Sequence, residues 1–154
     1  MVRLVRTDSH NKDFVNLVAN LDADLGKRDG EDHDFYHQFN SIDSIKYAVV
    51  AYSDEIAVGC GAIKEHDENS MEVKRMYVPL ISRGKGIATK VLQELEKWAA
   101  ELNYSSCVLE TGKRQPEAIS LYKKNGYEIR NGLFKELIFL AFFIWNYNFQ
   151  FELY

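Results

Sequence analysis

The chain has 154 residues, about the size of one domain, and its 46% hydrophobic and 27% charged residues are typical of an ordinary soluble protein. A formal net charge of −4 argues against nucleic acid as the main partner, because it implies no broad basic face. The two cysteines, Cys60 and Cys107, stand in apolar contexts and outside any CxxC pair, so we expect buried free thiols rather than a zinc site or a disulfide. The first residues, MVRLVRTDSHNKD, contain no apolar stretch long enough for a signal peptide, and the expected location is the cytoplasm.

The first half of the chain predicts a helix followed by three strands. Residues 9–25 carry apolar side chains at three- and four-residue steps, and Ser9 or Asn11 could cap the helix start. A polar segment rich in acids and aromatics follows and is expected to form a loop that leads into a short helix. Apolar runs at 47–52, 56–64 and 72–78, joined by tight turns, then predict an antiparallel meander.

The second half alternates helices and strands. Pro79 ends the third strand because it lacks a backbone N–H, and a long amphipathic helix is expected from about Gly86. A short strand at 107–109 precedes a helix that has Pro116 in its first turn and Asn125-Gly126 at its end, and residues 127–130 start another strand. There is no internal repeat and no linker, so the expected fold is one α/β domain.

The stretch SRGKGIATK, residues 82–90, places two glycines and three cations between a strand and a helix. This order can form an anion-binding site, since the free N–H groups and the dipole of the first helical turn attract negative charge. Gly84 and Gly86 would let the backbone approach a ligand closely. The alternative is a solvated turn that only caps the helix. Neither a GxxxxGK[ST] motif nor a GxGxxG motif is present.

Together with its flanks, the stretch resembles the GCN5-related N-acetyltransferase superfamily. RGKGIA matches the Arg/Gln-x-x-Gly-x-Gly/Ala signature, and MYV, VLET and AISLYKKNGY stand at the family spacing on either side. The resemblance covers about residues 45–130. It implies an α/β (α+β) fold with a central, mixed, mostly antiparallel twisted sheet of about six or seven strands, one splayed pair of strands and about four helices. Residues 1–154 would then form a single N-acetyltransferase domain.

The resemblance also implies acetyl-CoA as co-substrate, with no metal. Its pyrophosphate would lie on the loop and first helical turn, lined by Arg83, Gly84, Lys85, Gly86, Ile87, Ala88 and Thr89. Met76, Tyr77 and Val78 would line the pantetheine arm, and the Val78 N–H would polarise the thioester carbonyl. Gln115 stands near the place where many members carry a cofactor-binding Asn.

Two residues are expected to take part in the chemistry. Tyr122 matches the tyrosine that often protonates the departing thiolate in this family, and its alternative is a core tyrosine on a helix face. Glu72 stands where the histone-acetyltransferase branch has its general base, acting directly or through water, and its alternative is a solvated residue at a turn edge. The implied reaction is direct attack of a primary amine, of a small molecule or a peptide, on acetyl-CoA in a ternary complex. The alternative function is a catalytically silent acyl-CoA-binding regulatory module.

The acceptor is suggested only by charge. Six acids, at 22, 24, 29, 31, 32 and 34, face two cations in the segment 22–34 and would favour a cationic amine, unless they form an ordinary solvated loop. His33 and His37 stand four residues apart, but no firm third ligand supports a metal site.

The last residues, 133–154, depart from the family pattern. The run 137–145 is nine apolar residues long, too short to span a bilayer, and no membrane partner is expected. A buried strand or a subunit interface, which would make the protein a homodimer, accounts for it. A changed reading frame that leaves an unrelated tail is the alternative.

Overall fold

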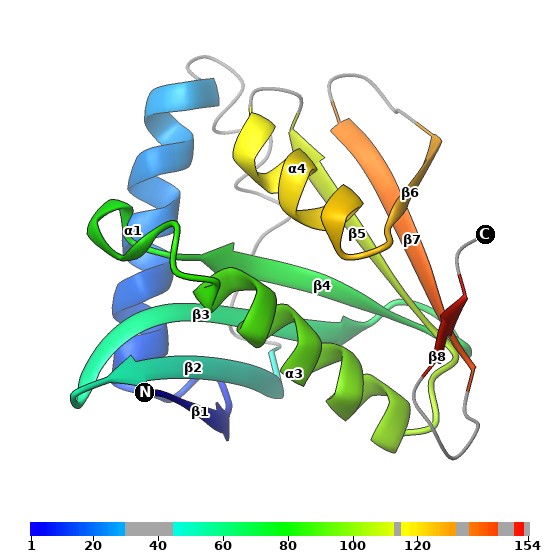
Figure 1. Ribbon diagram of the computed structural model, residues 1–154, viewed down its shortest axis with the longest axis horizontal. Helices are drawn as coiled ribbons and strands as arrows, with labels where there is room; N and C mark the ends of the chain where they lie inside the picture. Colours follow the sequence, from blue (N-terminus) through cyan, green and yellow to red (C-terminus); the bar gives the residue numbers. More distant parts are fainter. Residues whose placement is uncertain (30–44, 113–114, 132–135, 145–149, 153–154) are drawn as a thin grey trace.

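The computed structural model describes residues 1–29, 45–112, 115–131, 136–144 and 150–152, with side chains described for 1–27, 45–112 and 115–129. Its elements, shown in Figure 1, are β1 (Val2–Thr7), α1 (Lys12–Asp29), β2 (Tyr47–Ser53), β3 (Ile56–Glu65), β4 (Ser70–Tyr77), the 3-10 turn η2 (Leu80–Ser82), α3 (Ile87–Glu101), β5 (Ser106–Gly112), α4 (Pro116–Lys124), β6 (Glu128–Asn131), β7 (Glu136–Ile144) and β8 (Gln150–Glu152). Every strand and helix expected from residue 45 to residue 130 is present. The short helix expected after α1 lies outside the described residues.

All described strands belong to one sheet, in the order β1-β2-β3-β4-β5-β7-β6, with β8 on β7. The first four strands form an antiparallel meander, β4 and β5 run parallel, and the pairs made by β7 are antiparallel. The expected mixed, mostly antiparallel sheet is therefore confirmed. In the described part of the chain the sheet has eight strands rather than six or seven, because β1 and β8 add to it.

The parallel pair β4 and β5 separates part of the way along. Register partners run from Ser70–Ser106 to Val73–Leu109 and then stop, although β4 continues to Tyr77 and β5 to Gly112. Figure 1 shows the two strands diverging beyond that point. This is the splayed pair that the family resemblance implies.

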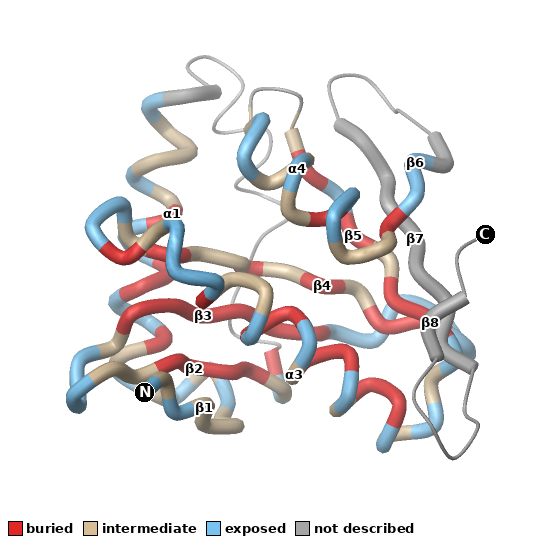
Figure 2. Tube along the Cα trace, in the orientation of Figure 1, coloured by how far each residue is buried: buried red, intermediate tan, exposed pale blue. Residues whose placement is uncertain are grey.

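Two hydrophobic cores lie on opposite faces of the sheet. Helices α3 and α4 cover one face, where Val91, Leu92 and Leu95 pack against Met71 and other strand side chains. Helix α1 covers the other face, where its buried residues are Phe14, Leu17 and Val18. Figure 2 shows the burial concentrated in the middle strands and along one side of α3.

Local signals explain where the helices begin and end. Asn11 accepts a hydrogen bond from the Phe14 N–H at 3.0 Å, so Asn11 and not Ser9 caps α1. Pro116 occupies the first turn of α4, as expected. Gly126 has a φ of 89°, the left-handed conformation that favours glycine after a helix end.

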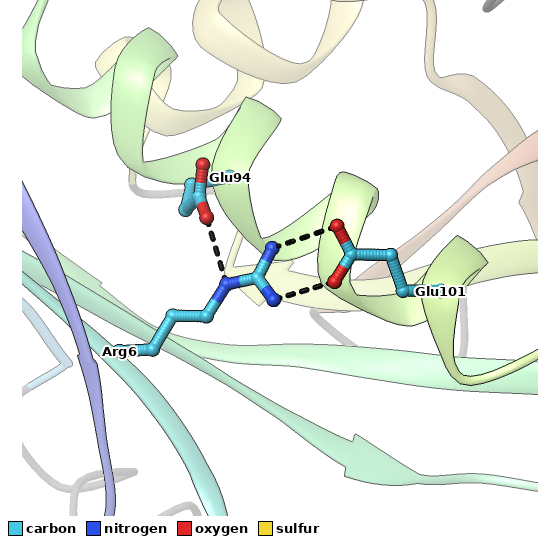
Figure 3. Close-up of polar contacts among 3 residues, drawn as sticks. All are labelled: Arg6, Glu94 and Glu101. Atoms are coloured by element: carbon cyan, nitrogen blue, oxygen red, sulfur yellow. Dashed lines mark hydrogen bonds and ion pairs between the residues drawn. The ribbon is translucent and has the colours of Figure 1, made fainter.

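The sequence interpretation missed β1. Residues VRLVRT do not alternate strictly, since Leu4 and Val5 are both apolar and Arg6 and Thr7 both polar, so six residues give only a weak strand signal. Arg6 of β1 reaches α3, where Nε donates to Glu94 at 2.7 Å and the two terminal nitrogens donate to Glu101, as Figure 3 shows. The guanidinium also lies 4.9 Å from the centre of the Trp98 ring. Long-range partners, and not local propensity, hold this edge strand in place.

The unusual C-terminal segment forms a strand of the same sheet. β7 lies between β5 and β6 and pairs with β5 at seven positions, from Ser106–Phe142 to Gly112–Glu136. The expected strand is therefore present over 136–144. Its apolar composition is compatible with a place between two other strands of the sheet.

Candidate active site

The site is built where β4 leaves β5. Cys60 pairs with Tyr77 and Ala62 pairs with Lys74, so β4 has one residue more than β3 between these two positions. This bulge contains Arg75, whose φ of 59° is left-handed. Bulges bend a strand and redirect its side chains, and they occur next to active sites. The following residues, Met76, Tyr77 and Val78, thus lie on backbone that has no register partner on β5.

Beyond β4 the chain turns through η2 into the glycine loop. Gly84 and Gly86 have φ values of 77° and 75°, and a Cβ at either position would meet nothing within 4 Å. Conformation, and not crowding, therefore requires glycine here. Gly86 is the N-cap of α3 and supplies no side-chain cap, so the helix leaves its first N–H groups to a ligand or to water. Lys85 is exposed beside them, and the arrangement suits a diphosphate.

The Arg83 side chain makes contacts on two sides of the glycine loop. Its Nε donates to the Val78 carbonyl at 2.8 Å, and its Nη2 lies 3.5 Å from Asp24 of α1. The side chain thus joins the glycine loop to the end of β4 and to α1. Ile87 is buried in the α3 core, whereas Ala88 and Thr89 are half-buried in the first turn of the helix.

Arg75 makes a second link to α1. Its Nη1 donates to Asp22 at 2.8 Å, and only 3% of its side chain is exposed. Among the described residues, its buried Nε has no hydrogen-bond partner. An unpaired buried donor costs about 1–3 kcal/mol, so this nitrogen needs an explanation. The sequence interpretation missed Arg75. The adjacent cations Lys74 and Arg75, near the mostly apolar end of a strand, could have indicated it.

Arg75 and Arg83 pair with two acids of the acidic segment 22–34. Asp22 and Asp24, two of its six acids, face Arg75 and Arg83 and are therefore neutralised. They add no net negative charge with which to attract a cationic amine. The side chains of the other four acids, and His33 and His37, lie outside the described residues.

Tyr122 lies on α4, on the sheet face that α3 covers. It is 5% exposed, and its ring makes an edge contact with Tyr127 at 5.7 Å between centroids. Burial raises the pKa of Tyr122 above the ordinary tyrosine value, so its hydroxyl stays protonated at neutral pH. This environment is compatible with both roles expected of Tyr122, a core tyrosine and a donor to the departing thiolate. The residue packs in the core, and its hydroxyl is a hydrogen-bond donor.

Glu72 lies in the part of β4 that still pairs with β5, opposite Val108. Its carboxylate accepts a hydrogen bond from Lys74 Nζ at 3.1 Å, and 20% of its side chain is exposed. Six residues of strand separate it from Val78, which is roughly 20 Å of extended chain. By this estimate the Glu72 carboxylate is too far along the strand to contact an acceptor at the Val78 N–H directly.

Gln115 is the N-cap residue of α4, and its Nε2 would lie 3.4 Å from a Cβ on Gly112 at the end of β5. It therefore stands beside the open end of the splayed pair. Both cysteines are buried and free, as expected, and burial raises the pKa of Cys60 to about 12. In the described part of the chain no three His, Cys, Asp or Glu side chains come together as metal ligands. None of the described helices is long and apolar enough to cross a membrane.

A splayed parallel pair, a bulge on one of its strands and an uncapped glycine loop at a helix start define an acyl-CoA-binding N-acyltransferase fold. The model of the acetyltransferase (GNAT) family matches residues 15–127, and the chain belongs to this family. It is 32% identical to an IAA acetyltransferase from Azospirillum brasilense over 84% of this chain and 86% of that protein.

Solved structures agree with this assignment. A candidate acyl-CoA N-acyltransferase from Klebsiella pneumoniae superposes with a TM-score of 0.74 at 28% identity, over 91% of this chain and 96% of that one. The PaiA N-acetyltransferase from Thermoplasma acidophilum, solved with coenzyme A, superposes with a TM-score of 0.71 at 18% identity, over 91% and 98% of the two chains, and shares the fold. The protein is an acetyl-CoA-dependent acyltransferase, with acetyl-CoA as co-substrate.

Proposed function

We propose that this protein transfers the acetyl group of acetyl-CoA to a primary amine by direct attack in a ternary complex. The observation that carries the proposal is the end of β4–β5 pairing at Val73–Leu109, which leaves the rest of β4 unpaired with β5 on the way to the uncapped glycine loop. A direct mechanism needs no nucleophile from the chain. Burial raises the pKa of Cys60 to about 12 and that of Cys107 well above its ordinary value, so neither thiol is ionised at neutral pH.

Cofactor binding is assigned to the glycine loop and the free part of β4. Backbone N–H groups of residues 83–89, with Lys85, would hold the pyrophosphate at the positive end of α3. Met76, Tyr77 and Val78 would pair with the pantetheine arm, and Gln115 would contact it from α4. The Val78 N–H would polarise the thioester carbonyl, a contribution of about 3–4 kcal/mol for a donor of this kind. Arg83 would keep the loop in place through Val78 and Asp24, so its own contact with phosphate is secondary.

Tyr122 is proposed to donate a hydrogen bond to the departing sulfur. Because burial raises its pKa, full proton transfer to a thiolate of pKa about 8.5 is uphill, and charge stabilisation is the larger part of the role. Glu72 is proposed to accept the proton of the amine through water, because it lies too far along β4 for direct contact with an acceptor at Val78. Lys74, 3.1 Å away, would orient its carboxylate.

The test is thiol release from acetyl-CoA with a panel of amines, for wild type, Tyr122→Phe and Glu72→Gln. We expect kcat to fall about 10- to 100-fold in each variant, with the Kd for coenzyme A unchanged, since general acid–base groups contribute at least this much. Glu68→Gln, a change at an exposed turn residue, is the control. Rates within about threefold of wild type in both variants would show the two roles to be wrong. Coenzyme A binding by calorimetry without turnover on any amine would instead identify the silent binding module.

A further inference from the structure

Arg75 is a charged residue that the proposed mechanism does not use. It lies in the bulge of β4, at the start of the stretch that has no register partner on β5. Its side chain, 3% exposed, is directed to the α1 side of the sheet, where Asp22 accepts its one described hydrogen bond at 2.8 Å. Among the described residues, nothing accepts a hydrogen bond from the buried Nε.

Within the described residues the guanidinium therefore keeps an N–H group that no protein atom accepts, at the start of the stretch of β4 that has no partner on β5. A guanidinium presents its N–H groups as a flat fork that matches a carboxylate with two parallel hydrogen bonds. The contact with Asp22 uses Nη1 and leaves the edge that contains Nε. A link that served only to tie β4 to α1 would need one nitrogen, which a lysine also provides.

We propose that Arg75 binds a carboxylate of the acceptor, so that the acceptors are amino acids or other amines that carry a carboxylate. The proposal rests on the acetyl transfer proposed above and names the substrate class of that site. Arg75 lies three residues before Val78, which is roughly 10 Å along the strand. The Arg75 side chain covers part of that distance, and an acceptor with its amine at Val78 would have to cover the rest. A few bonds between the amine and the carboxylate are enough for that span.

The charges around Arg75 favour a zwitterion over a polycation. Asp22 of α1 balances Arg75, and Glu72 balances Lys74 on the same strand. Lys74 lies opposite Ala62 of the α1 core, which places this second pair on the same face of the sheet. Two balanced ion pairs present both signs and no net charge. An amino acid, with one charge of each sign, matches them better than a polyamine does.

The test compares acceptors that differ only in the carboxylate. For wild type, thiol release is measured with a set of amino acids, with their α-amides, and with the amines that remain when the carboxyl group is absent. We expect kcat/KM for at least one acid to exceed that of its amide and its decarboxylated amine by about 100-fold or more, as is typical when a charged hydrogen-bond partner is lost. If the amides or the simple amines are acetylated as well as the acids, the proposal is wrong.

Variants then assign the effect to Arg75. Arg75→Lys keeps the positive charge without the flat guanidinium, and Arg75→Met removes both. For the acids, kcat/KM should fall at least tenfold in Arg75→Lys and further in Arg75→Met. Most of the loss should be a rise in KM. Rates with the amides should stay within threefold. Arg3→Met is the matched control, because Arg3 lies on the edge strand β1, pairs with Glu55 of the turn between β2 and β3, and is 54% exposed. Equal losses for acids and amides would show that Arg75 only supports the structure.

Failure of the Arg75 proposal and failure of the proposed acetyl transfer give different results. If Arg75→Met does not fold, calorimetry on wild type with coenzyme A bound compares an N-acetylated amino acid with its amide, and equal affinities overturn the proposal. If coenzyme A binds and no amine of any kind is acetylated, the proposed function fails, and the acceptor proposal that rests on it fails as well.

Discussion

At the scale of single residues, Glu96 is a carboxyl group inside the core. It lies on α3, is 2% exposed, and among the described residues its Oε1 has no hydrogen-bond partner. Burial raises its pKa from 4.5 to about 7, although the neighbouring Tyr127 acts in the opposite direction. The same surroundings raise the pKa of Tyr127 well above its usual value, mainly by burial. Glu96 is therefore mostly neutral below about pH 7.

This pKa makes stability depend on pH. Because the pKa of Glu96 is higher in the folded state, its contribution to stability is fully present below pH 4.5 and is lost as the pH rises through about 7. The loss amounts to about 3 kcal/mol, at 1.36 kcal/mol for each pH unit of the shift. We expect Glu96→Gln to be more stable than wild type by up to that order at pH 8 and nearly unchanged at pH 4. Urea unfolding across this range measures it, and an equal effect of Glu68→Gln, an exposed control, would contradict the explanation.

At the scale of elements, the edge strand β1 is joined to α3 by the polar contacts of Arg6, in addition to the packing of Val2 and Leu4 against the core that α3 covers. Arg6 contacts Glu94, Glu101 and Trp98 of α3, all in different turns of the helix. The Arg6 guanidinium holds the pKa of Glu101 below its usual value. These side chains are 23–38% exposed, so water and salt weaken the contacts.

Removing Arg6 should loosen β1 rather than the core. We expect Arg6→Ala to lower the free energy of unfolding by roughly 1–2 kcal/mol, the sum of surface ion pairs and a cation–π contact. The loss should shrink at 1 M salt, because screening already weakens the pairs in wild type. Arg3→Ala should cost less than about 0.5 kcal/mol, since Arg3 and Glu55 are 54% and 85% exposed. A loss of stability that is the same for both variants, or that does not change with salt, would argue against this account.

At the scale of the whole molecule, the late strand β7 is inserted between two strands that precede it in the chain. β7 lies between β5 and β6, so β6, which precedes it in the chain, reaches the sheet only through it. The open end of the splayed pair is therefore supported on its β5 side by β7. β8, by contrast, pairs with β7 at three positions only.

Two truncations should therefore behave differently. A chain that ends at residue 131 loses β7 and leaves β5 with an unpaired edge along seven positions, and we expect it to aggregate and to bind no coenzyme A. A chain that ends at residue 144 loses β8 and should keep its fold. Gel filtration, circular dichroism and calorimetry with coenzyme A check both. Normal folding of the shorter chain would show that the sheet does not need β7.

The amino-acid sequence by itself determined the elements between residues 45 and 130, the glycine loop and the family. Each of these rests on local patterns: apolar periodicity, Pro79 and Gly126 as end signals, and glycines at positions that require a positive φ. Tertiary structure alone decided the position of β1, the insertion of β7 between β5 and β6, and the contacts of Arg75 and Arg83 with α1. The physical reason is distance along the chain. Strand pairing and ion pairs over 50 or more residues, such as Arg75 with Asp22, depend on how the sheet closes, and no local pattern carries that information.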